Sequence, residues 1–75
     1  MPRTADKHRI PLDAPKVREL REAQKLSQAA LAKRAGLPSA QYLSDIERGI
    51  RVNLTIETLD RIAAALGVKA KDLLK

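Results

Sequence analysis

The sequence contains no cysteine, a single tyrosine, and neither phenylalanine nor tryptophan. The absence of cysteine excludes disulfides, thiolate metal sites and a cysteine nucleophile, and fits a reducing compartment. Because aromatic side chains are so scarce, the core must be built from leucine, isoleucine, valine and alanine. No apolar run approaches the roughly 20 residues of a membrane span, and no apolar segment follows the charged N-terminus as in a signal peptide. We therefore expect a cytoplasmic protein that makes no contact with a membrane.

The sequence is rich in positive charge, with 15 lysines and arginines against 9 aspartates and glutamates and a net charge of +6. A basic surface concentrates polyanions around the protein, and nucleic acid is the commonest of these. Many small soluble proteins are also basic, so charge alone leaves the partner open. With 75 residues, the chain can form one domain with a small core.

The first 12 residues mix charged side chains with two prolines and show no hydrophobic periodicity. We therefore expect a flexible basic arm over residues 1–13 and a folded domain over residues 14–75. Such an arm can touch phosphates or a minor groove, although a disordered end would have the same composition. His8 stands alone in this arm, so we expect no metal site there.

Apolar side chains at helical spacing predict four helices and a short fifth one, over residues 14–25, 28–35, 40–48, 56–66 and 70–74. The first four begin at side chains that commonly cap helices, which are Asp13, Ser27, Ser39 and Thr55. Glycines follow the second, third and fourth helices. The expected core residues are Val17, Leu20, Ala23, Leu31, Ala32, Ala35, Leu43, Ile46, Ile56, Leu59, Ile62, Ala63, Leu66 and either Leu73 or Leu74.

Residues 28–46 form a unit of helix, glycine turn and helix. Ala32 offers a small side chain where two helices can cross closely, and Gly36 permits a turn that a side chain would resist. The second helix of the unit has only Leu43 and Ile46 as aliphatic anchors, which leaves it a broad polar face. This arrangement is typical of a helix-turn-helix, whose second helix lies in the DNA major groove.

The segments RELREAQKLSQAALAKRAGL, YLSDIERG and LTIETLDRIAAALGV resemble the Cro and phage-repressor type of helix-turn-helix, the xenobiotic-response-element family. The resemblance covers roughly residues 16–74. It implies an all-α, lambda-repressor-like bundle of four or five helices, in which the second and third form the helix-turn-helix. It also implies a transcriptional repressor that binds an inverted-repeat operator in double-stranded DNA as a homodimer. We expect no cofactor, metal or small-molecule ligand.

The resemblance assigns roles to individual residues. Those expected to read bases are Gln28, Ser39, Ala40, Gln41 and Ser44. Gln41 is the strongest of them, because its amide can pair bidentately with adenine. Those expected to contact phosphates are Ser27, Lys33, Tyr42, Arg48, Arg51 and Asn53. Arg21 and Glu47 match a structural ion pair that joins the first helix to the third. For each contact residue a solvated surface position stays open, as do a capping role for Ser39 and simple packing for Tyr42.

The sequence departs from the family pattern between Gly36 and Gly49, where it has one residue more. We place the extra residue in the segment 37–39, before the third helix begins. Inside that helix it would turn Tyr42 and Asp45 towards the core, and a buried, unpaired aspartate is costly.

Other functions compete less well. An enzyme is not expected, because the sequence offers no cysteine, one histidine in the arm and no glycine-rich phosphate loop. RNA binding usually needs more stacking aromatics than one tyrosine. An antitoxin-type protein-binding module, which pairs with a toxin or another regulator and also represses its own operon, stays open. So does a controller protein of a restriction–modification operon. Candidates for a dimer surface are Leu66, Val68, Leu73 and Leu74.

Overall fold

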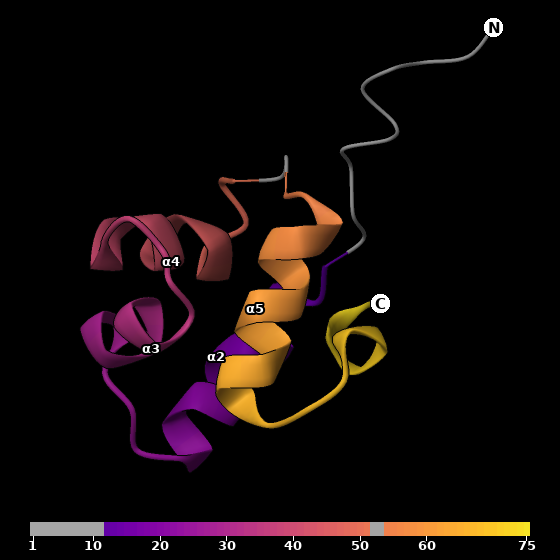
Figure 1. The fold of residues 1–75 in the computed structure, drawn as a ribbon, viewed down its shortest axis with the longest axis horizontal. Helices are drawn as coiled ribbons and strands as arrows, with labels where there is room; N and C mark the ends of the chain where they lie inside the picture. Colours follow the sequence, from indigo (N-terminus) through magenta and orange to yellow (C-terminus); the bar gives the residue numbers. More distant parts are fainter. Residues whose placement is uncertain (1–11, 52–53) are drawn as a thin grey trace, which may run out of the picture.

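The computed structural model describes residues 12–51 and 54–75 and is built from helices (Figure 1). Its elements in chain order are α2 (Ala14–Ala23), α3 (Gln28–Arg34), α4 (Ala40–Glu47), α5 (Ile56–Leu66) and the 3₁₀-helix η1 (Ala70–Leu73). The described residues contain no strand beyond an isolated antiparallel bridge between Leu12 and Leu74. The predicted all-α fold is confirmed, with the fifth helix reduced to a short 3₁₀-helix.

The four predicted caps all bond to the helices that follow them. The Asp13 carboxylate accepts from the Lys16 N–H at 3.3 Å, and the hydroxyls of Ser27, Ser39 and Thr55 accept in the same way. Lys25, just beyond α2, has a φ of 58° and is the one non-glycine residue with a positive φ in the described ranges. The caps are predictable from sequence because only a few side chains satisfy the free N–H groups of a first turn.

The core gathers aliphatic side chains from every helix. Its buried members are Val17, Leu31, Ala32, Ala35, Leu43, Ile46, Leu54, Leu59, Ile62, Ala63, Leu66 and Leu73. Two predicted members are wrong, since Ala23 and Ile56 are exposed. Ala23 is the last residue of α2, and Ile56 is the first of α5, at the edge of its apolar stripe. Helical periodicity predicts which face of a helix is apolar. It does not predict how much of that face the neighbouring helices cover, so residues at the helix ends can stay exposed.

The helices divide the molecule into two ends. Figure 1 shows α3 and α4 together at one end, α5 in the middle with α2 behind it, and η1 beside the C-terminus at the other end. Leu73 of η1 is fully buried, and its carbonyl accepts from the Asp13 N–H at 2.8 Å. Residues 1–11 of the predicted arm lie outside the described residues, whereas Leu12 and Asp13 are fixed to the C-terminal turn.

Two further properties concern the described residues only. None of their helices is long and apolar enough to cross a membrane. Their aspartate and glutamate side chains form no group of three that could hold a metal ion.

Candidate nucleic-acid interface

The turn between α3 and α4 sets the angle at which these helices meet. Gly36 has a φ of 71°, which permits the Leu37 N–H to donate back to the Ala32 carbonyl at 2.8 Å. The Ala32 side chain is buried, with 3% of its surface exposed. Because only a methyl group stands at the contact, α4 can pack closely across α3.

The register of α4 matches the prediction. Leu43 and Ile46 are completely buried, while Tyr42 and Asp45 keep part of their surface exposed. Helix α4 starts directly after Ser39, as the sequence predicts. The polar face therefore points outwards, with Gln41 exposed and Ala40 and Ser44 half-buried beside it.

An ion pair between α2 and α4 fixes the outward orientation. Arg21 Nε lies 2.7 Å from Glu47 Oε2, and Arg21 Nη2 lies 3.2 Å from Glu47 Oε1, so the contact is bidentate. The remaining Arg21 nitrogen, Nη1, donates to the Leu26 carbonyl at 2.7 Å. Only 11% of the Arg21 side chain and 3% of the Glu47 side chain are exposed. The pair expected from the family resemblance is thus formed, and it is shielded from solvent.

The hydrogen bond to Glu47 raises the pKa of the Arg21 guanidinium above its ordinary value, although burial opposes the shift. A base whose pKa is raised on folding stabilises the folded state at every pH below its ordinary pKa. This contribution disappears only as the pH rises through the raised value. The raised pKa of Arg21 therefore contributes its full stabilisation of the folded state at neutral pH.

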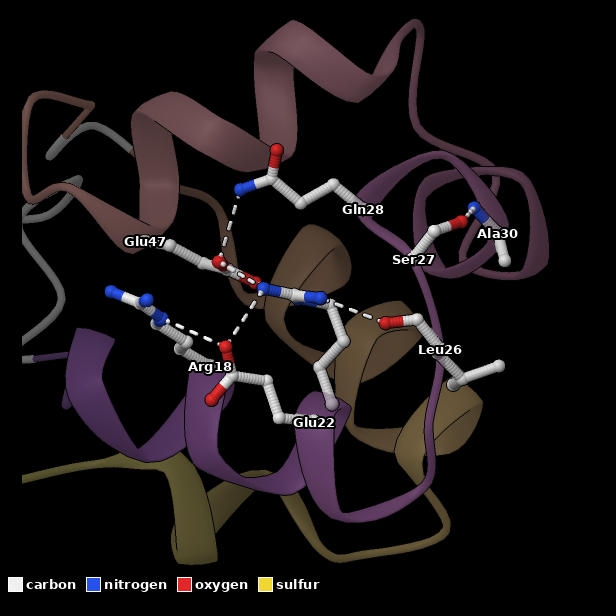
Figure 2. Close-up of polar contacts among 8 residues, drawn as sticks. Arg18, Glu22, Leu26, Ser27, Gln28, Ala30 and Glu47 are labelled. Atoms are coloured by element: carbon white, nitrogen blue, oxygen red, sulfur yellow. Dashed lines mark hydrogen bonds and ion pairs between the residues drawn. The ribbon is translucent and has the colours of Figure 1, made fainter.

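Gln28, at the start of α3, is bound to the same carboxylate. Its Nε2 donates to Glu47 Oε1 at 3.2 Å. Figure 2 shows the Gln28 side chain reaching towards Glu47, with the amide oxygen directed away from the contact. The sequence did not reveal this contact, because it depends on how closely α3 and α4 approach. Its consequence is that the Gln28 amide is held in one orientation beside α4.

Two more base-reading candidates, one at the start of α4 and one on it, also bond within the protein. Ser39 Oγ accepts from the Tyr42 N–H at 3.1 Å, which makes Ser39 the cap of α4. Gln41 Nε2 donates to Asp45 Oδ1 at 2.9 Å, one turn further along. A glutamine four residues before an aspartate is a known helix pair, so this spacing could have been recognised in the sequence.

The phosphate-contact candidates that the structure describes are exposed, except for the half-buried Tyr42. Arg48 and Arg51 are exposed at the end of α4, and Lys33 is exposed in the last turn of α3. The Arg51 guanidinium carbon lies 4.1 Å from the centre of the Tyr42 ring, which sequence reasoning missed. Ser27 Oγ caps α3 by accepting from the Ala30 N–H at 3.0 Å. Asn53 lies outside the described residues.

The candidates for a dimer surface need correction. Leu66 and Leu73 are 3% and 0% exposed and belong to the core, because α5 and η1 pack on one another. Val68 is half-buried and Leu74 is 36% exposed. Two more apolar residues, which were not among the predicted candidates, are exposed beside the connection between α4 and α5: Ile50 at 58% and Ile56 at 62%.

Curated proteins that resemble this chain include a control protein and a phage repressor. It is 45% identical over 60 residues to the control protein C.BamHI of Bacillus amyloliquefaciens, a match that covers 79% of this chain and 72% of that protein. It is 43% identical over 54 residues to the immunity repressor protein of Bacillus phage phi105, which covers 72% of this chain. The chain spans only 36% of that repressor.

Solved structures agree on the fold. The P22 c2 repressor, crystallised with a synthetic operator, superposes with a TM-score of 0.77 at 33% identity, over 85% of this chain and 94% of that one. The hydroxypropylphosphonic acid epoxidase of S. wedmorenis contains the same fold within a larger protein, with a TM-score of 0.78 at 30% identity, over 92% of this chain and 36% of that one. A family model described as helix-turn-helix matches residues 17–73. The chain therefore belongs to the helix-turn-helix family.

Proposed function

We propose that this protein is a sequence-specific regulator of transcription, a repressor that places α4 in the major groove of double-stranded DNA. The observation that carries the proposal is the polar face of α4. Gln41 and Ser44 lie on the side of the helix opposite its buried anchors Leu43 and Ile46. A helix held this way presents amide and hydroxyl groups to base edges.

The residue roles follow from this placement. We assign base contacts to Gln28, Ser39, Ala40, Gln41 and Ser44. We assign phosphate contacts to Ser27, Lys33, Arg48, Arg51 and Asn53, and we propose that Tyr42 contributes by holding Arg51 over its ring. The capping bonds of Ser27 and Ser39 use their hydroxyl oxygens as acceptors, so each hydroxyl can still donate to DNA.

The similar proteins support a regulator over an enzyme. Two are a control protein and an immunity repressor, and a third was crystallised with an operator. The epoxidase is more than twice as long as the part that matches, so its match covers the helical fold alone. We propose that this chain acts in the cytoplasm as a DNA-binding protein without catalysis or a cofactor.

We further propose that it binds as a homodimer to an inverted repeat. A recognition helix of two turns reads only a few base pairs, and two copies on one face of the duplex would combine their affinities. Repression then depends on the concentration of the protein and on the spacing of its half-sites.

The test is selection from a randomised duplex pool at about 50 and 200 mM salt. We expect an enriched inverted repeat that is bound more weakly at the higher salt. Gln41→Ala should lose the sequence preference. Lys71→Ala, which removes one positive charge from η1 at the opposite end of the molecule, should keep it. If no sequence is enriched, the DNA-reading proposal is wrong, and the antitoxin-type function with a protein partner takes its place.

A further inference from the structure

We infer that Asp45 determines base specificity by fixing the Gln41 amide in the orientation that accepts adenine and rejects guanine. This inference rests on the proposed function, because it concerns how α4 reads DNA. Asp45 itself is a positioning residue, which acts on DNA through Gln41.

The geometry places both side chains on the outer face of α4. Gln41 is exposed and Asp45 is half-buried, one helical turn apart. Gln41 Nε2 lies 2.9 Å from Asp45 Oδ1, which is a hydrogen bond to a charged acceptor. Bonds of this kind are roughly twice as strong as those between neutral groups.

The chemistry of the pair permits one orientation of the amide. An ionised carboxylate only accepts hydrogen bonds, so it must face the NH₂ group of Gln41. A flipped amide would place its oxygen against the carboxylate oxygen. The Gln41 oxygen is therefore directed away from Asp45.

The position of Asp45 is itself fixed. Its backbone carbonyl accepts from the Ile50 N–H at 2.9 Å and from the Arg51 N–H at 3.1 Å. These two bonds close the end of α4 and hold the aspartate in the last turn. The carboxylate thus acts from a backbone position that does not depend on DNA.

The bond leaves Gln41 with one free N–H and one free oxygen. This donor–acceptor pair matches the major-groove edge of adenine, which offers N7 as an acceptor and the N6 amino group as a donor. Guanine offers two acceptors, N7 and O6. With one N–H held by Asp45, the amide cannot donate to both, and its oxygen would face O6. The pair therefore selects adenine over guanine.

Asp45 also carries a negative charge on a face that approaches phosphates, so it lowers affinity for every duplex. Two variants separate this charge from the hydrogen bond. Asp45→Ala removes both, whereas Asp45→Asn removes the charge but keeps an oxygen that can accept from Gln41. Removal of the charge should raise the affinity of both variants for every duplex by a similar factor, and any loss of preference in Asp45→Ala is measured on top of this common gain.

The experiment measures Kd for the selected duplex and for the same duplex with adenine replaced by guanine at the base pair where Gln41→Ala loses its preference. Thermal unfolding of each variant verifies that it is folded. We expect Asp45→Ala to lose about tenfold in the preference for adenine, in the range of one bidentate base contact, and Asp45→Asn to retain it.

Two results would overturn the inference. Asp45→Ala could change the affinity for both duplexes equally, which leaves it no role in specificity. Alternatively, both variants could alter the preference at a neighbouring base pair, which would mean that Asp45 reads a cytosine amino group directly. The proposed function fails separately, if the unmodified protein prefers no sequence at all.

Discussion

At the scale of single residues, we expect the largest effect on the free energy of unfolding at the Arg21–Glu47 ion pair. Removing the arginine leaves a carboxylate that is 97% shielded, with Gln28 as its remaining side-chain donor among the described residues. An uncompensated buried charge costs about 3 kcal/mol or more, which is a large share of the stability of a small domain. We therefore predict that Arg21→Ala lowers the free energy of unfolding by about 3 kcal/mol, measured by urea denaturation.

Arg61→Ala is the matched control for this prediction. Arg61 also forms an ion pair with a glutamate, Glu57 at 2.9 Å, but both side chains are more than half exposed. Its removal should change stability by less than about 0.5 kcal/mol. Equal losses in Arg21→Ala and Arg61→Ala would show that burial of the pair is unimportant.

The stacking of Arg51 on Tyr42 predicts how this tyrosine contributes to binding. A guanidinium 4.1 Å from a ring centre is held by cation–π attraction, worth about 0.5–1 kcal/mol at exposed sites. We expect Tyr42→Phe, which keeps the ring, to bind DNA as the unmodified protein does. Tyr42→Leu should weaken binding a few-fold, and should add no further loss in an Arg51→Ala background. A loss in Tyr42→Phe would instead assign the contact to the hydroxyl.

At the scale of helices, much could be predicted from sequence because the signals are local. The starts of four helices follow from the capping residues that precede them. The register of α4 follows from the cost of burying Asp45, and the structure buries Leu43 and Ile46 as that argument requires. A helix-turn-helix could therefore be recognised before any contact was known.

What could not be predicted depends on how the helices meet. The bond from Gln28 to Glu47 joins side chains 19 residues apart, on two helices whose crossing the sequence does not specify. The same reason explains why Ile56 was wrongly predicted to be buried. It lies on the apolar stripe of α5, but the helices that pack on this stripe do not extend as far as Ile56. Gln41 and Asp45 are an exception, because their spacing of four residues on one helix is enough to predict the hydrogen bond between them.

The end of α2 carries strain that a glycine would relieve. Lys25 has a φ of 58°, which costs a residue with a side chain about 1–2 kcal/mol. Lys25→Gly removes this cost. It also increases the conformational entropy of the unfolded chain, which lowers stability by about 0.4–1 kcal/mol. We predict a net gain of up to about 1.5 kcal/mol, seen as a higher melting temperature. Lys25→Ala keeps the strained backbone and should give no such gain.

The start of α4 makes a second prediction at this scale. Ser39→Ala should cost about 1 kcal/mol of stability, because the Tyr42 N–H loses its partner. Ser39→Asp keeps an acceptor at the cap and should restore the stability. It should nevertheless weaken binding to every duplex, because it adds a negative charge to the face that approaches the DNA. If thermal unfolding finds Ser39→Asp as unstable as Ser39→Ala, capping is not what Ser39 contributes.

At the scale of the whole molecule, the two ends have different surfaces. One end contains α3 and α4 and bears the polar face of the recognition helix. The other end contains η1 and the C-terminus (Figure 1), where Leu74 forms a backbone bridge with Leu12. Exposed apolar side chains occur at two places, with Ile50 and Ile56 beside the α4–α5 connection and Leu74 beside the C-terminus. The dimer that we propose can use only one of these surfaces in a symmetric pair.

We predict that the second copy binds at Ile50 and Ile56. Beside them α5 carries both Glu57 and Arg61, so the surface presents charges of both signs and can complement itself across a twofold axis. Two isoleucines fall short of the roughly 800 Å² per partner of a stable interface, so the free dimer should be weak. It should form mainly on DNA with half-sites about 34 Å apart, the length of one helical turn.

Ile56→Ser and Leu74→Ser test this assignment with equivalent changes on the two surfaces. Ile56→Ser should abolish cooperative binding to the inverted repeat while each half-site is still bound, as measured by titration of duplexes with one and two half-sites. Leu74→Ser should leave cooperativity intact, because its surface lies at the far end from α4. If only Leu74→Ser removes cooperativity, the dimer forms through the C-terminal turn. The two recognition helices would then have to face outwards from a more distant axis, and the spacing of the selected half-sites should be longer by a turn of the DNA.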